Sequence, residues 1–221
     1  MITKTHRWME PQQSVHGPRR TPDPAEVLQI PRPGFRVLGR RRLIDLLDRA
    51  TRRRVTLVCA PTGAGKTVAC AAWAAAKAGT CPIIWLTLHS EDDQAWLWAH
   101  LCSGMKRASV TPSELVHALE DGSASAFPLR LAETARLFAE PVVIVLDNVD
   151  HVTSDGTLKG LDLLVRYAPP SLRIVLCGRR PPGLDLARYR SSGDLAEISA
   201  ADLSAHIHPP GVMRLRPQAP S

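Results

Sequence analysis

Runs of consecutive apolar residues recur along the middle of the chain, and each is short enough for a single strand. The longer runs do not alternate apolar with polar positions, which is typical of parallel strands with both faces covered by helices. We therefore predict buried strands within five segments: 55–60 (VTLVCA), 81–88 (CPIIWLTL), 141–150 (PVVIVLDNVD), 171–180 (SLRIVLCGRR) and the shorter 194–199 (DLAEIS).

Helical patterns separate these runs. Within residues 34–54, Leu43, Ile44, Leu46 and Leu47 recur at the spacing of an amphipathic helix, with arginines on its outer face. Strands that alternate with helices predict parallel β-α-β units, so the expected fold class is α/β, a doubly wound parallel sheet. The other predicted helices lie within residues 66–79, 91–108, 113–122, 128–140, 156–169 and 183–193.

Both ends of the chain lack such periodicity. Residues 1–33 combine prolines with scattered charges, and residues 204–221 are also rich in proline. We expect disordered segments at both ends and one domain at 34–203 between them. No apolar run is long enough to cross a membrane, and the N-terminus lacks the apolar stretch of a signal peptide. We therefore expect a cytoplasmic protein with no membrane partner.

The net charge of the 221-residue chain is +7, but the basic excess is local. Residues 1–54 hold 13 Lys and Arg against 5 Asp and Glu, which gives +8 and leaves −1 for the remainder. We interpret this excess as a solvated tail and a polar helix face. The five cysteines show no C-x-x-C spacing, and His206 and His208 have no third ligand beside them, so no metal centre is predicted there.

The segment APTGAGKT at 60–67 lies between a predicted strand and a predicted helix. It fits the phosphate-binding pattern G-x-x-x-x-G-K-(S/T), except that Ala60 replaces the first glycine. Such a turn presents backbone N–H groups at a helix N-terminus, where phosphate is attracted. We expect Lys66 to reach the β- and γ-phosphates of ATP and Thr67 to bind Mg²⁺. The complete set of predicted nucleotide-binding residues is Pro61, Thr62, Gly63, Ala64, Gly65, Lys66 and Thr67.

A phosphate loop also needs an acid for the metal, and Asp147 directly follows an apolar run. We expect Asp147 at the end of a neighbouring strand, where it and Thr67 hold Mg²⁺. A second acid would activate the attacking water, but Asn148 cannot take a proton, so Asp150 is the nearest candidate base. Three further acids follow the second strand, and a helix cap explains them equally well: Glu91, Asp92 and Asp93.

Arg179 follows the fourth long apolar run, with Arg180 beside it. At the carboxyl edge of a parallel sheet, such a residue can contact the γ-phosphate, so Arg179 is a candidate catalytic residue. A surface arginine without a role in the site is the alternative.

These segments resemble the NTPase module of the large ATP-binding LuxR-type, MalT-like transcriptional regulators, which belong to the STAND class of P-loop NTPases. The resemblance covers about residues 35–203 and rests on VTLVCAPTGAGKTVACAAW, IIWLTLHSEDDQAWLWAHL, PVVIVLDNVDHV and RIVLCGRRPPGLDLARYRSSGDLAEISAADL. It implies ATP binding, slow hydrolysis, and a switch between an ADP-bound resting state and an ATP-bound state that oligomerises. By motif match it assigns the phosphates and Mg²⁺ to Gly63, Gly65, Lys66 and Thr67, the metal-binding acid to Asp147, and the arginine after the fourth strand to Arg179.

The sequence departs from that family in two respects. The family has two adjacent acids on the metal-binding strand, whereas the second position here is Asn148, which leaves hydrolysis open. Family members also continue through a sensor domain and a DNA-binding helix-turn-helix, which suggests that this sequence is a truncated member or a stand-alone module. Direct DNA binding is therefore not expected. We expect an ATP-binding switch, at most a slow ATPase, that acts as a homo-oligomer or with a full-length relative.

Three other hypotheses stay open. A regulatory module would hold nucleotide without turnover and act through a partner protein. A nucleic-acid-binding protein would use the basic segment 39–54, although neither interleaved aromatic residues nor a helix-turn-helix pattern accompanies it. A P-loop kinase or other transferase would need an acceptor-site motif, which the sequence does not display.

Overall fold

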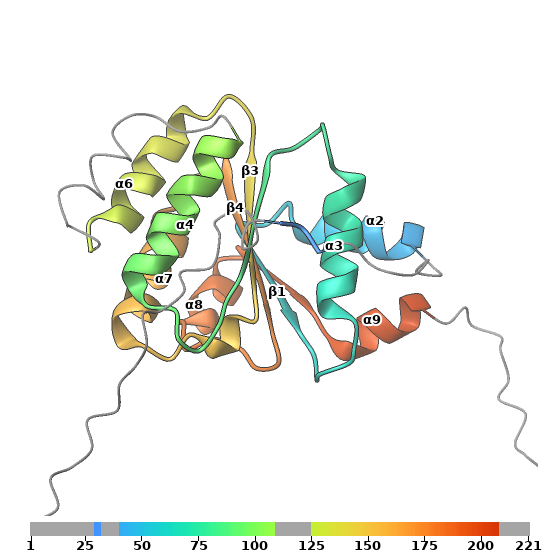
Figure 1. Cartoon of the computed structure of the whole chain (residues 1–221). Helices are drawn as coiled ribbons and strands as arrows, with labels where there is room; N and C mark the ends of the chain where they lie inside the picture. The colour runs from blue at the N-terminus through green and yellow to red at the C-terminus, as the bar shows by residue number, and fades with distance from the viewer. Residues whose placement is uncertain (1–28, 32–39, 109–124, 208–221) are drawn as a thin grey trace, which may run out of the picture.

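A computed structural model of the protein describes residues 29–31, 40–108 and 125–207. Its centre is a five-stranded sheet in which every neighbouring pair is parallel, with the order β2-β3-β4-β1-β5 (Figure 1). The predicted α/β class with a parallel sheet is confirmed. The strands are β1 (Val55–Cys59), β2 (Ile83–Thr87), β3 (Val142–Asp147), β4 (Leu172–Gly178) and β5 (Leu195–Ile198).

Helices cover both faces of the sheet, as expected for a doubly wound fold (Figure 1). One face carries α2 (Arg40–Ala50), α3 (Lys66–Ala76) and α9 (Ala200–Ile207). The other face carries α4 (Gln94–Arg107), α6 (Phe127–Thr134), α7 (Asp155–Tyr167) and α8 (Leu186–Ser191). Two short 3-10 helices complete the described elements: η1 (Ala135–Leu137) and η2 (Val149–His151).

Both sides of the central strands are buried, which explains their unbroken apolar runs. In β3, Val142, Ile144 and Leu146 belong to the core cluster beneath α4, α6 and α7. Val143 and Val145 belong to the second cluster, beneath α2 and α3. Successive side chains of a strand point to opposite faces, so a strand covered on both sides needs an apolar residue at every position.

At the carboxyl edge of the sheet, side chains cap the N-termini of helices α4 and α7. The N-terminus of α3 has no such cap. Asp93 accepts a hydrogen bond from Trp96 N at 2.8 Å, and Ser154 accepts one from Thr157 N at 3.3 Å. Such caps satisfy N–H groups that have no partner within the helix. Helix α3 has neither a side-chain cap nor an acid in its first turn, so no side chain satisfies the N–H groups at its start.

The last helix, α9, was missing from the sequence prediction. It is stabilised by a capping box, in which Asp202 Oδ2 accepts from Ser199 N at 2.8 Å and Ser199 Oγ accepts from Asp202 N at 3.4 Å. Leu203 of α9 is only 1% exposed in the second core cluster. The helix runs to residue 207 and so continues past 203, where the predicted domain ends.

Other sequence predictions are corrected or lie outside the described residues. The strand that carries Asp147 is not adjacent to β1, because β4 lies between β1 and β3. Within the segment 1–33 that was expected to be disordered, Ile30 is half-buried against the second core cluster. The helix predicted at 113–122 and the rest of both expected tails lie outside the described residues.

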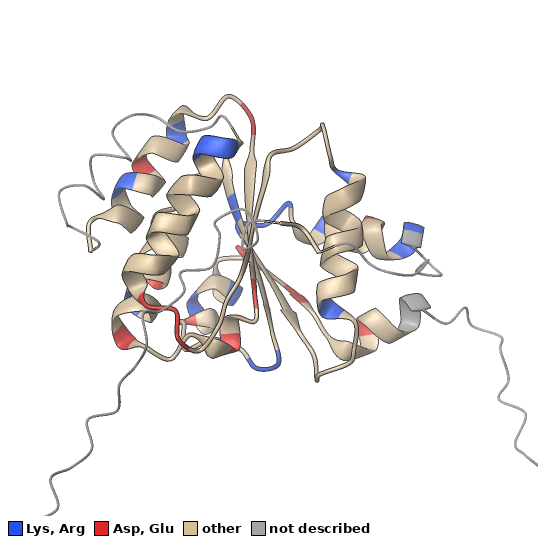
Figure 2. Cartoon of the chain, in the orientation of Figure 1, with Lys and Arg blue, Asp and Glu red and all other residues tan. Residues whose placement is uncertain are grey.

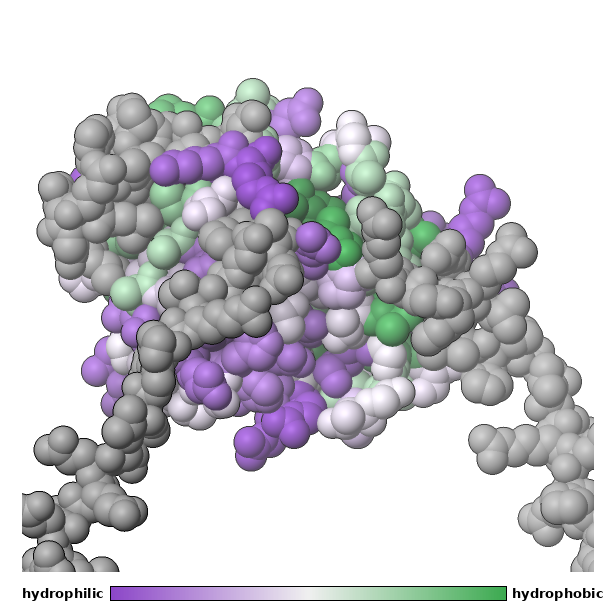
Figure 3. Space-filling view, viewed as in Figure 1, coloured by the Kyte–Doolittle hydropathy of each residue, from purple (hydrophilic) through white to green (hydrophobic). Residues whose placement is uncertain are grey.

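Charge differs between the two edges of the sheet. In Figure 2 several acidic residues lie towards the lower edge of the sheet, where the strands end, next to a basic loop at the bottom, and other basic residues lie in the upper half. The lower part of the face seen in Figure 3 is correspondingly hydrophilic. This separation suits the helix dipoles, because helices begin at the edge where strands end. No helix in the described part of the chain is long and apolar enough to span a membrane.

Candidate functional site

Two glycines in the left-handed conformation shape the loop between β1 and α3. The φ angles of Gly63 and Gly65 are 81° and 82°, values that other residues rarely adopt. A Cβ atom at either position would meet nothing within 4 Å, so the backbone conformation and not crowding requires glycine. Pro61 and Thr62 are exposed, and Ala64 N donates to Pro61 O at 3.2 Å. The loop therefore has open space beside its backbone.

Donor groups converge on this loop. Helix α3 has no side-chain cap, and Ala69 N donates to Gly65 O at 2.8 Å in its first turn. The Lys66 ammonium donates to Ala60 O at 2.7 Å and to Pro61 O at 3.1 Å. Uncapped N–H groups beside an ammonium form a donor set that suits a phosphate.

Ala60 directly follows β1, and its side chain packs in the core. Its N–H donates to Gly178 O at 3.3 Å, and its side chain is 3% exposed in the core. Its φ is not positive, because Asn148 is the only non-glycine residue with a positive φ among the described residues. The conformation at this position therefore does not require the glycine of the full pattern.

The two predicted metal ligands are in direct contact. Thr67 Oγ1 lies 2.9 Å from Asp147 Oδ2 and 3.1 Å from Asp147 Oδ1, so the start of α3 meets the end of β3 across the intervening β4. Hydroxyl and carboxylate oxygens are suitable ligands for Mg²⁺. Within the described ranges, no group of three or more His, Cys, Asp or Glu is placed to hold a metal. A Mg²⁺ ion here would therefore take its other ligands from nucleotide and water.

Burial controls the electrostatics of Asp147, which is 2% exposed. Burial raises the pKa of Asp147, while the hydrogen bonds from the Thr67 hydroxyl and Asn148 N–H and the Lys66 charge lower it. The charge of Asp150 raises it further, so the pKa lies above the ordinary aspartate value. A divalent cation would offset the unfavourable burial of this carboxylate.

Asn148 turns the chain immediately after Asp147. Its φ of 59° and ψ of 39° lie in the left-handed region, which asparagine tolerates better than most residues. The turn leads into η2, where His151 N donates to Asn148 O at 2.9 Å. The amide of Asn148 cannot accept a proton from water, so this residue contributes a turn and not a base.

Asp150 binds Arg179 at the end of β4. Its Oδ1 accepts from Arg179 N at 2.9 Å and its Oδ2 accepts from Arg179 Nε at 2.7 Å. Burial alone would raise the pKa of Asp150, but the hydrogen bonds and charge of Arg179 lower it below the ordinary value. A carboxylate with a lowered pKa and both oxygens bonded is a weak proton acceptor. The geometry therefore does not favour the role of base that the sequence suggested for Asp150.

The acids after β2 stabilise local structure. Asp93 is the N-cap of α4, which agrees with the helix-cap explanation given for these acids. Glu91 is exposed. Asp92 Oδ2 accepts from His89 N at 2.7 Å, which closes the turn before α4. Nothing in this arrangement directs these carboxylates to the loop.

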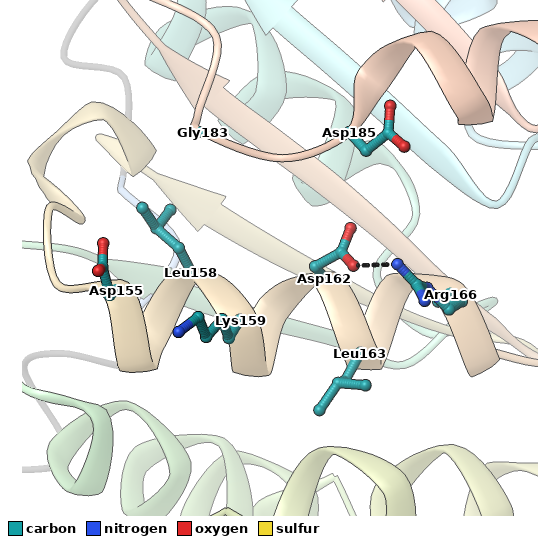
Figure 4. A pocket seen from close by; sticks show the side chains of 8 residues that line it. All are labelled: Asp155, Leu158, Lys159, Asp162, Leu163, Arg166, Gly183 and Asp185. Carbon is teal, nitrogen blue, oxygen red and sulfur yellow. Dashed lines mark hydrogen bonds and ion pairs between the residues drawn. The ribbon is translucent and has the colours of Figure 1, made fainter.

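A groove of about 580 Å³ lies along α7, and no predicted site residue lines it (Figure 4). Figure 4 shows Asp162 and Arg166 side by side on α7, joined by an ion pair of 2.8 Å, with Gly183 and Asp185 on the segment across from them. A phosphate cradle built from backbone groups at an open sheet edge needs no such cavity. The candidate site is therefore the loop with Asp147 and Arg179, and not this groove.

Comparison with known families places the same residues inside one domain. The sequence profile described as AAA domain matches residues 48–184. This range begins near the end of α2 and includes the loop, Asp147 and Arg179.

The chain is also similar to parts of two much longer proteins. It is 29% identical over 189 residues to the serine/threonine-protein kinase PknK of Mycobacterium tuberculosis (strain ATCC 25618 / H37Rv), which covers 82% of this chain and 17% of PknK. It is 29% identical over 170 residues to the HTH-type transcriptional regulator MalT of Serratia proteamaculans (strain 568), which covers 75% of this chain and 18% of MalT. The chain thus spans less than a fifth of either relative.

Two solved structures are similar to this chain at low sequence identity. The ORC1 protein of Aeropyrum pernix, in complex with DNA, is 19% identical, with a TM-score of 0.49, and the match covers 73% of this chain and 44% of that one. The Drosophila ORC bound to AT-rich DNA and Cdc6 is 10% identical, with a TM-score of 0.48, and the match covers 73% and 56%.

Proposed function

The chain belongs to the AAA domain family, and on that premise we propose that its loop binds ATP with Mg²⁺ and that the domain is a nucleotide-dependent switch in signalling. The observation that carries the proposal is the contact between Thr67 and Asp147, which joins the phosphate loop to a buried acid. The proposed metal ligands are Thr67 and Asp147. The proposed phosphate-binding residues are Pro61, Thr62, Gly63, Ala64, Gly65, Lys66 and Thr67.

Each group has a distinct task in this proposal. The N–H groups in the first turn of α3 bind phosphate oxygens, and Lys66 exchanges its bonds to the carbonyls of Ala60 and Pro61 for bonds to phosphate. When bound, Mg²⁺ supplies positive charge that neutralises the phosphates. Thr67 and Asp147 orient that ion, and Arg179 contacts the γ-phosphate from the end of β4.

We propose that hydrolysis is slow at most. Asn148 cannot act as a base, and Asp150 is bonded through both oxygens to Arg179. The same observations favour a second candidate function, a regulatory module that binds nucleotide without hydrolysing it. In both cases the bound nucleotide, and not its turnover, carries the signal.

The regulatory role is inferred from the relatives, one named as a protein kinase and the other as a transcriptional regulator. We propose a cytoplasmic domain, comprising residues 34–203 and extended through α9, that works with a second copy or a full-length relative. We do not propose DNA binding. Two of the basic residues that precede β1 make contacts within the domain, since Arg53 donates to Gly193 O at 2.8 Å and Arg54 pairs with Asp194 at 3.9 Å.

The substitution Asp147→Asn separates stability from function. The folded-state pKa of Asp147 is above its unfolded value, so its ionised form destabilises the fold as pH rises through that pKa. Asparagine keeps an acceptor for Thr67 without the buried charge. At pH 7 we expect the Tm of the nucleotide-free protein to rise by about 1–3 °C. ATP with Mg²⁺ should stabilise this variant far less than the wild type, and any phosphate release should fall to background.

Asp155→Asn is the matched control, because Asp155 is an exposed carboxylate in the first turn of α7. This variant should respond to ATP with Mg²⁺ as the wild type does. If Asp147→Asn keeps the full Mg²⁺-dependent response to ATP, Asp147 does not hold the metal and the proposal is wrong.

A further inference from the structure

A single turn, residues 147–150, joins the two halves of the candidate site. At its start, Asp147 accepts a hydrogen bond from Thr67 on the loop side. At its end, Asp150 accepts two hydrogen bonds from Arg179 at the end of β4. The loop and Arg179 are therefore connected through four consecutive residues.

The conformation of Asn148 directs Asp150 toward β4. The left-handed backbone at Asn148 reverses the chain into η2, and no other non-glycine residue in the described part of the chain has a positive φ. The turn then packs closely on Gly178, where an added Cβ would lie 3.0 Å from Asp150 Oδ1 and 3.1 Å from Val149 Cγ1. Both the left-handed residue and the glycine are thus needed for this fit.

Asp150 holds Arg179 by one end of its guanidinium group. The Asp150 side chain is 3% exposed, whereas that of Arg179 is 52% exposed. Asp150 bonds to the main-chain N and Nε of Arg179, and Arg179 Nη2 lies 3.5 Å from His151 Nε2. The guanidinium group keeps further N–H groups that Asp150 does not bind. A guanidinium group anchored in this way by a carboxylate is held ready to bind a second anion.

The main chain of Arg179 lies beside the end of β1, the strand that leads into the phosphate loop. Cys59, the last residue of β1, donates from Sγ to Arg179 O at 3.5 Å. Burial raises the pKa of the Cys59 thiol, and the charges of Lys66 and Asp150 both act on it. The Lys66 ammonium and the Asp150 carboxylate, which binds Arg179, are therefore both close enough to Cys59 to affect its ionisation.

We infer that Asp150 is a positioning residue, held in place by the Asn148 turn, that aims Arg179 at the γ-phosphate and so gives the site its preference for ATP over ADP. This inference rests on the proposed nucleotide-binding function. It assigns Asn148 a structural task in the turn that follows the metal-binding acid. It also distinguishes the role of Asp150 from that of a base, because Asp150 acts only through Arg179.

The test compares affinities for Mg²⁺-ADP and for a Mg²⁺-ATP analogue with a non-hydrolysable β–γ bridge. The proteins are the wild type, Asp150→Asn, Arg179→Gln and the double variant. Each single substitution should weaken binding of the ATP analogue by roughly 5–10-fold and change ADP binding by less than about twofold. The double variant should bind the ATP analogue no more weakly than Arg179→Gln does. Asp150 acts only through the Arg179 side chain, which both of these variants lack. Without nucleotide, the same four proteins should show non-additive changes in Tm.

A second pair of variants tests the turn. Asn148→Gly keeps access to the left-handed region and should retain the affinity for the ATP analogue within about twofold. Asn148→Val disfavours that region and should reproduce the ATP-specific loss of Asp150→Asn. Arg180→Gln, at the adjacent exposed arginine, is the control and should change neither affinity.

The inference is overturned if Asp150→Asn leaves the ratio of ATP to ADP affinity unchanged, or if its effect adds fully to that of Arg179→Gln. An unchanged ratio includes the case in which Asp150→Asn weakens ADP binding and ATP binding equally, which indicates general damage to the site. In these outcomes the wild type still binds both nucleotides, so the proposed function stands. If the wild type binds neither nucleotide, the proposed function fails and the inference fails with it.

Discussion

Replacing Lys66 with alanine is expected to abolish the stabilisation of this domain by ATP and ADP. The wild type at a nucleotide concentration 100 times its Kd should gain about 2.7 kcal/mol, or a Tm rise of roughly 5–10 °C. Lys66 supplies the charged donor beside the loop, and its loss should weaken binding by about 100-fold or more, or about 3 kcal/mol. Differential scanning fluorimetry at the same nucleotide concentration should therefore show a Tm rise below about 2 °C for this variant.

Lys77→Ala provides the matched control. Lys77 lies at the other end of the same helix, where it pairs with Asp48 at 2.7 Å. Its pair is partly exposed, so its loss should change the free energy of unfolding by about 1 kcal/mol or less. The nucleotide response should remain that of the wild type. Equal responses of the Lys66 and Lys77 variants would show that the ammonium at the loop has no special role.

Gly160→Ala is expected to destabilise the domain strongly, although it adds only one methyl group. Gly160 lies in α7 where the helix crosses α4, and an added Cβ would lie 2.6 Å from Trp98 Cζ2. Trp98 is completely buried, so its ring cannot move without displacing its neighbours. Overpacking of this kind costs about 1–3 kcal/mol, and the roughly 1 kcal/mol gain in helix propensity offsets part of it, which leaves a net loss of up to about 2 kcal/mol. We expect Tm to fall by up to about 8 °C.

Gly156→Ala makes the same chemical change one turn earlier in α7. There the added Cβ would meet Gln94 Oε1 at 3.1 Å, and Gln94 has a flexible side chain that can move aside. Tm should stay the same or rise by about 1–3 °C because alanine favours the helix. If Gly160→Ala also proves neutral, the close packing of α7 against α4 is wrong.

Local signals in the sequence were sufficient to predict the strands and the phosphate loop. The apolar run 142–146 is short and rich in β-branched residues, which favours a strand with both faces covered, and it forms β3. The loop is equally local, because Gly63, Gly65 and Lys66 are placed by the strand and helix on either side of it. Short-range pattern and backbone preference therefore determine these features.

Features that depend on the order of strands could not be predicted in the same way. The sequence predicts Asp150 as a base and Arg179 as a contact of the γ-phosphate. Their hydrogen bond to each other depends on β3 and β4 being adjacent in the sheet. Asn148 was interpreted as a missing acid, because its left-handed conformation has no signal in a single sequence. The capping box of Ser199 and Asp202 was visible in the sequence, and it could have predicted α9.

The most direct test of the central claim is a calorimetric titration of the wild-type protein with ATP, first with Mg²⁺ and then with EDTA. The contact between Thr67 and Asp147 predicts one ATP site per chain, with affinity about tenfold or more weaker when Mg²⁺ is removed. No binding of ATP at millimolar concentration in the presence of Mg²⁺, by a folded protein, would contradict the assignment of this loop as a nucleotide site.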